Sequence, residues 1–138
     1  MKCFATIEAG EGIKPLPHNP CRLLDMQLLT LPTGGTYAGR TGDREVLAVL
    51  LGGKATFVVG GETFARIGGR PNVFGGKPHS VYLPAGVEYR ISAEGPVQIA
   101  MPSAPSDLAA KPYVIPPAQV ANGTWGAANF SRYFHQIL

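Results

Sequence analysis

The side chains best suited to metal and acid–base chemistry are three histidines, His18, His79 and His135. They lie far apart along the chain, and none has a partner at the i+2 or i+4 spacing. A metal ion needs three or four ligands that converge on one point, so the sequence predicts no metal site. No Gly-x-Ser-x-Gly, P-loop or dinucleotide pattern occurs, so no cofactor is expected. His79 precedes a predicted strand, and we expect it in a loop or at a strand edge, with a pocket role as the alternative.

The elements that must position these residues are short strands. Eighteen glycines and 13 prolines favour many turns and few long helices, and Gly60-Gly61 between two β-prone runs predicts a hairpin. The predicted strands span residues 23–31, 45–51, 54–59, 62–67, 80–83, 88–93 and 97–101. Evenly spaced strands without intervening helices predict an all-β sandwich or barrel.

We expect three regions: an irregular N-terminal segment over 1–22, a β-barrel over 23–104, and a C-terminal extension or linker over 105–138. Residues 39–44 are predicted to form a polar bend. The predicted core consists of Leu47, Val49, Leu51, Phe57, Val59, Val81, Leu83 and Ile91.

Bulk composition excludes several classes of function. Hydrophobic residues make up 45% of the chain and charged residues 15%, which is typical of a folded domain rather than a disordered one. The net charge of +3 is scattered, whereas nucleic-acid binding needs a concentrated basic face. No apolar run reaches the roughly 18 residues that span a bilayer. Without a signal-peptide pattern, Cys3 and Cys21 are expected to be reduced thiols in a cytoplasmic protein.

Two short stretches resemble the patterns of the cupin fold. Glu45, six residues and Gly52 match the end of its first pattern, and Pro84-Ala-Gly86 matches the middle of its second. The resemblance implies a single jelly-roll barrel.

The same patterns imply where a cupin would hold its metal ligands. Counting back from Glu45, the first two histidine positions fall on Ala38 and Arg40, or on Gly39 and Thr41 if the spacing is one residue shorter. The third falls on Tyr89. In this register only Glu45 remains of four ligands.

If this register is right, Arg40, Glu45 and Tyr89 point into the barrel. A buried carboxylate needs a counter-charge, so we expect Arg40 to pair with Glu45 and to fill the vacated site. Alternatively, Arg40 recognises the carboxylate of a small sugar acid, with Tyr37 and Tyr89 facing the sugar. A wrong register is the third reading.

The segment Gly69-Arg70-Pro-Asn-Val73-Phe74-Gly-Gly-Lys77-Pro78-His-Ser-Val81-Tyr82-Leu83-Pro84-Ala-Gly86 is similar to part of the 5-deoxy-glucuronate isomerases of inositol catabolism. So are residues 42–54 and the C-terminal residues 129–138. The resemblance covers nearly the whole chain but only the N-terminal half of the family protein. It implies a bicupin, aldose–ketose isomerisation of a deoxy sugar acid, and metal-binding histidines in the other half.

Three functions remain open. The chain is a structural and assembly module with the chemistry elsewhere, a stand-alone degenerate cupin that binds a small sugar acid, or, ranked last, an active isomerase with Glu45 as base. The C-terminal residues 129–138 are too apolar for a free tail. We therefore expect a homodimer or larger assembly, formed through this segment or through exposed sheet edges.

Overall fold

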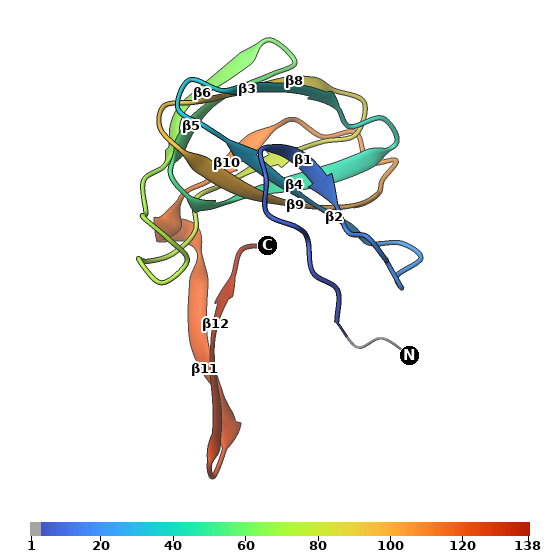
Figure 1. Ribbon diagram of the computed structural model, residues 1–138. Helices are drawn as coiled ribbons and strands as arrows, with labels where there is room; N and C mark the ends of the chain where they lie inside the picture. Colours follow the sequence, from blue (N-terminus) through green and yellow to red (C-terminus); the bar gives the residue numbers. More distant parts are fainter. Residues whose placement is uncertain (1–3) are drawn as a thin grey trace.

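The computed structural model describes residues 4–138 and consists almost entirely of β-strands (Figure 1). The strands are β1 (Gly12–Pro15), β2 (Asp25–Leu31), β3 (Thr36–Arg40), β4 (Arg44–Gly52), β5 (Lys54–Val59), β6 (Glu62–Gly68), β7 (Ser80–Leu83), β8 (Glu88–Ala93), β9 (Val97–Pro105), β10 (Tyr113–Ile115), β11 (Ala121–Ala127) and β12 (Phe130–Gln136). One 3₁₀ turn, Pro117–Gln119, interrupts them. The all-β prediction is confirmed.

Two sheets face each other and enclose the core. The six-stranded sheet has the order β1-β2-β9-β4-β7-β10, and the four-stranded sheet has the order β3-β8-β5-β6. Every pairing is antiparallel. The strands therefore form a jelly-roll sandwich rather than one closed ladder. The third sheet is the β11–β12 hairpin, which extends away from the sandwich (Figure 1).

The core lies between the two large sheets, because alternate side chains of each strand point inward. Along β4, Ala48 and Leu50 are fully buried, whereas Leu47 and Leu51 on the opposite face are only half-buried. The prediction that Leu47 and Leu51 lie in the core is therefore wrong, because the neighbouring residues Ala48 and Leu50 point inward instead. The other predicted core residues are buried: Val49, Phe57, Val59, Val81, Leu83 and Ile91.

Several strands lie where the sequence indicated none. Thr36–Arg40 forms β3, so the expected bend is confined to the turn before Arg44. Gly12–Pro15 forms an edge strand despite its proline, because proline lacks an N–H and an edge strand tolerates a missing donor. The C-terminal extension contains β10 and the β11–β12 hairpin. Both extensions are thus partly regular.

The turn between β7 and β8 ties the two sheets together. The buried hydroxyl of Thr41, just after β3, donates to the carbonyl of Pro84 at 2.8 Å and accepts from the N–H of Val87 at 3.0 Å. Gly86 has a φ of +79°, a conformation that glycine adopts without strain. The Pro-Ala-Gly match of the sequence is this turn.

Over residues 4–138 we find no helix with the length and apolarity to cross a membrane. Within the described residues, Cys21 is an exposed free thiol. The prediction for Cys3 lies outside the described residues.

Two neighbouring leucines test the inward–outward alternation of β4. We expect Leu50→Ala to lower the free energy of unfolding by about 2–5 kcal/mol, since it empties a fully buried site. Leu51→Ala should cost clearly less, because its side chain is half-exposed on the outer face. Urea unfolding of both variants measures the difference, and equal losses would contradict the alternation.

Candidate functional site

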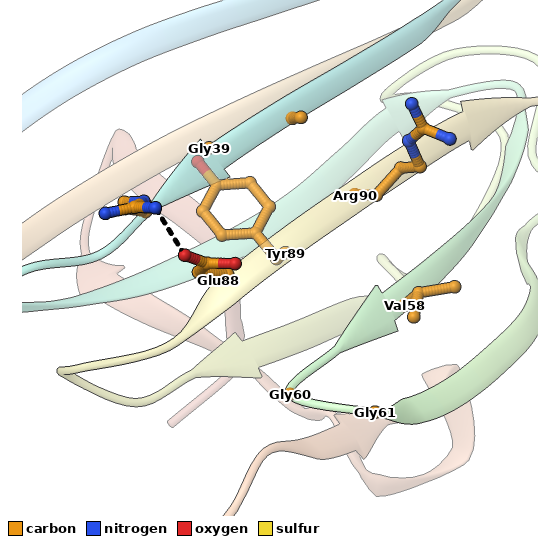
Figure 2. A pocket seen from close by; sticks show the side chains of 9 residues that line it. Gly39, Val58, Gly60, Gly61, Glu88, Tyr89 and Arg90 are labelled. Carbon is orange, nitrogen blue, oxygen red and sulfur yellow. Dashed lines mark ion pairs between the residues drawn. The ribbon is translucent and has the colours of Figure 1, made fainter.

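Two tyrosines fill the space between the sheets at one end of β3 and β8. Tyr89 is buried, and its ring centroid lies 6.1 Å from that of Tyr37 at a tilt of 49°. Gly39 is the cross-strand partner of Tyr89, and a Cβ at Gly39 would come within 2.6 Å of the Tyr89 hydroxyl. Figure 2 shows the Tyr89 ring reaching across to Gly39. Glycine is therefore required there to give the tyrosine its place.

Burial is the main cause that raises the pKa of Tyr89 well above the ordinary value for tyrosine, and the adjacent Tyr37 adds to it. Tyr89 therefore stays a neutral phenol across the physiological range. Such a group donates or accepts a hydrogen bond but does not act as an anionic metal ligand or base near neutral pH.

Arg40 lies on the outer face of the four-stranded sheet. The register of β3 and β8 places it opposite Glu88, and the two side chains form an ion pair at 2.5 Å while remaining 79% and 72% exposed. They line a shallow groove of about 610 Å³ with Val58, Gly60 and Arg90 (Figure 2). An ion pair this exposed contributes little to stability.

Glu45 lies on the outer face of the six-stranded sheet. Its Oε2 accepts a hydrogen bond of 2.6 Å from the hydroxyl of Tyr82. This bond, followed by burial, raises the pKa of Tyr82 to about 12, and the Tyr82 ring stacks on Tyr113 at 4.8 Å. Tyr82 was not among the predicted site residues. The pairing of β4 with β7 would have identified it, because it places Tyr82 opposite Leu47.

The predicted buried ion pair between Arg40 and Glu45 is wrong. The inward positions are 37 and 39 on β3 and 46, 48 and 50 on β4, as burial and pairing show. Arg40 and Glu45 therefore point out of opposite sheets, since a register error of one residue moves a side chain to the other face. Only Tyr89 faces the interior as the cupin register implied. Glu45 and Arg40 accordingly cannot work together as base and electrophile.

The interior does not offer a metal site. Within residues 4–138, no group of three or more histidine, cysteine, aspartate or glutamate side chains is arranged to hold an ion. The interior positions of β3 and β8 carry Tyr37, Gly39, Tyr89 and Ile91 instead. These residues do not fit the metal that the cupin resemblance implies.

His79 lies away from the tyrosines, beside the loop that joins β6 and β7. Its Nδ1 accepts a hydrogen bond of 3.0 Å from the N–H of Gly68, and burial lowers its pKa. The cavity that His79 lines, about 360 Å³, also includes Arg70 and Lys77. Neither of these was predicted as a site residue. Of the five predicted site residues, only Tyr37 and Tyr89 contact one another; a ligand role for each of the five remains a prediction.

Comparison with known structures first shows that the fold is that of a cupin. A cupin protein from Bacteroides fragilis superposes with a TM-score of 0.55 over 80% of this chain and 92% of its own, at 14% identity. An IolB-like protein from Salmonella typhimurium LT2 superposes with a TM-score of 0.87 at 26% identity, over 97% of this chain and 52% of its own.

Sequence comparison then identifies the family. Residues 12–138 match the KduI/IolB family, and the chain belongs to that family. It is 36% identical to the 5-deoxy-glucuronate isomerase of Geobacillus kaustophilus and 32% identical to that of Geobacillus thermodenitrificans, each over 133 residues. These residues are 95% of this chain but 48% of each relative. The chain thus spans about half the length of the curated relatives it matches.

We predict that the purified chain carries no stoichiometric transition metal, because two tyrosines and a glycine occupy the interior. Elemental analysis after dialysis measures this directly. About one zinc, manganese, iron or nickel per chain, lost on Tyr89→Phe but kept on Tyr133→Phe, would contradict it.

The raised pKa of Tyr89 also predicts a loss of stability in alkali. The pKa of a tyrosine in an unfolded chain is about 10, whereas folded Tyr89 keeps its proton to higher pH. The folded state then binds more protons than the unfolded state, so the free energy of unfolding falls as the pH rises through about 10. Tyr89→Phe should remove this part of the fall.

Urea unfolding between about pH 8 and pH 11 measures the slope. Tyr133→Phe is the control, because it removes a phenol that is exposed on the hairpin rather than buried between the sheets. Tyr82 is present in both variants, so its contribution to the slope cancels when they are compared. An identical slope in Tyr89→Phe and the unmodified chain would mean that Tyr89 is not buried.

Proposed function

We propose that the chain is a metal-free cupin module of a 5-deoxy-glucuronate isomerase-like protein in cytoplasmic carbohydrate (inositol) catabolism, and that it acts through assembly rather than catalysis. The observation that carries this proposal is the Tyr37–Tyr89 pair in place of metal ligands. Further support comes from the half-length match to the isomerases and from two apolar surfaces.

The first apolar surface is the outer face of the six-stranded sheet. The paired registers of β2, β9, β4 and β7 place one set of side chains on this face. Its apolar members are Met26, Leu28, Leu47, Leu51, Tyr82, Ala100 and Pro102, and the polar residues Thr30, Glu45 and Gln98 share the face. Most are half-buried, and a small, almost wholly apolar cavity of about 180 Å³ lies among them, with Leu138 at its edge. An outward sheet face this apolar is typical of a surface that another unit covers.

The second apolar surface is one face of the β11–β12 hairpin. The register pairs Trp125 with Arg132 and Gly123 with Phe134, so Trp125, Phe130 and Phe134 share this face. They are 73%, 55% and 43% exposed. The other face carries polar residues such as Thr124 and Ser131. A two-stranded hairpin alone is marginally stable in water, so its apolar face needs a partner.

The partner that we propose is a second copy of this chain. One molecule carries both an apolar sheet face and an apolar arm that leaves the sandwich from the side of that sheet (Figure 1). In a two-fold dimer each arm would lie on the partner's sheet face, so that the same contact occurs twice and both surfaces are covered. In the longer relatives, the residues beyond the matched half would take the place of the second copy.

Light scattering tests the assembly. At roughly tens of micromolar we expect the mass of a dimer, since association depends on concentration. The variant Trp125→Ser with Phe134→Ser should be monomeric with an unchanged β-sheet spectrum. Phe74→Ser is the control, because Phe74 is 94% exposed but lies in the loop before β7.

A monomeric unmodified chain would refute the second copy as partner. A dimer that persists in the hairpin variant but is lost in Leu47→Ser, on the sheet face, would refute the role of the arm. A dimer lost equally in the Phe74→Ser control would refute the specificity of both surfaces.

A further inference from the structure

The loop between β6 and β7 is held in one conformation by Arg70. Its Nε and Nη2 donate to the carbonyl of Leu50 at 3.2 and 2.9 Å, and its Nη1 donates to the carbonyls of Gly76 at 2.8 Å and Val73 at 3.5 Å. The carbonyl of Leu50 is available because the ladder between β4 and β7 ends at the pair Val49 and Ser80, while the N–H of Leu50, on the same side of the strand, donates to the carbonyl of His79. The loop therefore forms a fixed wall around the cavity of about 360 Å³.

Three side chains on this cavity are hydrogen-bond donors. His79 accepts at Nδ1 from Gly68, so in its neutral form the proton is on Nε2, which becomes a donor. Lys77 uses one ammonium proton on the carbonyl of Val120 at 2.7 Å and keeps two others. Arg70 spends its donors on carbonyls but keeps its charge.

The positive charge here has no acidic partner. Within the described part of the chain the single ion pair is Arg40–Glu88, which lies on the other sheet. The residues that line the cavity include no aspartate or glutamate, and burial lowers the pKa of both Arg70 and His79. A bound anion would relieve this unfavourable environment.

We propose that this cavity binds the carboxylate of a small organic acid. Lys77 would provide the main counter-charge, Arg70 a second charge at the cavity wall, and His79 a hydrogen bond from Nε2. The volume lies at the lower end of the range for small-molecule sites, which suits a ligand of monosaccharide size. Ion pairs and charge-assisted hydrogen bonds of this kind are the strong ones in a sheltered site. The site is independent of the assembly proposed above, because it uses neither the hairpin aromatics nor the outer sheet face.

The three histidines make the test direct, since each gives its own imidazole signals in a proton NMR spectrum. The pH titration of the intact chain is recorded with and without sodium glucuronate, and His79→Gln assigns the signals. We expect glucuronate to raise the pKa of His79 by about one unit, which corresponds to about tenfold tighter binding by the protonated imidazole. His18 and His135 serve as internal controls and should not move.

Matched ligands and variants show whether a shift of the His79 pKa comes from the carboxylate and whether Lys77 contributes to binding. Glucose, which lacks the carboxylate, should leave His79 unchanged, and phosphate should shift it less than glucuronate. Lys77→Gln should weaken glucuronate binding about tenfold or more, since it removes a charge-assisted hydrogen bond. Lys14→Gln should not weaken it, because Lys14 is on β1, at the opposite edge of the sheet from β7 and β10.

The proposal is overturned if His79 does not respond to glucuronate, if glucose gives the same shift, or if phosphate gives a larger one. Equal affinities in Lys77→Gln and Lys14→Gln would overturn the role of Lys77. Because the first measurement uses the unmodified chain, a folding defect in a variant cannot hide the answer. The oligomeric mass, measured on the same samples, separates this result from the assembly proposal.

Discussion

The filling of the sandwich interior depends on the close approach of Tyr89 to Gly39. The tyrosine ring lies where a Cβ of residue 39 would be, so the pair excludes any larger residue from that position on β3. Tyr37 packs beside it, and Phe57, Val59 and Ile91 continue the same layer. These apolar and phenolic side chains occupy the inward positions at this end of the sandwich, and none of them is a ligand type that holds a divalent ion near neutral pH.

The end of the β4–β7 ladder is the second constraint, because it leaves the backbone of Leu50 free to hold the long loop before β7. The backbone of Leu50 is used twice: its N–H donates to the carbonyl of His79 at 3.1 Å, and its carbonyl accepts from Arg70. One residue of the central strand therefore fixes both ends of the loop. The leucine side chain meanwhile points into the core. The cavity beside His79 is thus attached through these bonds to β4, a central strand of the six-stranded sheet.

Much of the fold was predictable because turn and strand signals are local. The Gly60-Gly61 hairpin, the Pro84–Gly86 turn and the strand after Gly86 follow from a few neighbouring residues. Which side chains of β4 point inward was harder to predict. The run Glu45–Leu51 is apolar at both odd and even positions, so it shows no alternation of polar and apolar residues. A pattern match anchored on Glu45 then put Arg40 inside, whereas the pairing of β3 with β8 puts Gly39 inside. The Arg70 bonds were also beyond prediction from the sequence, because they depend on where the ladder between β4 and β7 ends, which only the pairing of these strands reveals.

The apolar residues that made the inward side of β4 hard to predict also have a physical consequence on its outer side. Leu47 and Leu51 add nothing to the core, yet they stand where a sheet with one wet face would carry polar residues. Trp125, Phe130 and Phe134 repeat this on one face of the hairpin, where Arg132 stacks on Phe130. Leaving two such surfaces in water would cost the free energy of hydrating them, roughly 25 cal/mol for each Å² of apolar area. The hairpin cannot cover its own apolar face, because it extends away from the sandwich. A partner that covers the sheet face and the arm together removes both apolar areas from water. The outward-facing residues of this chain therefore favour association with a partner.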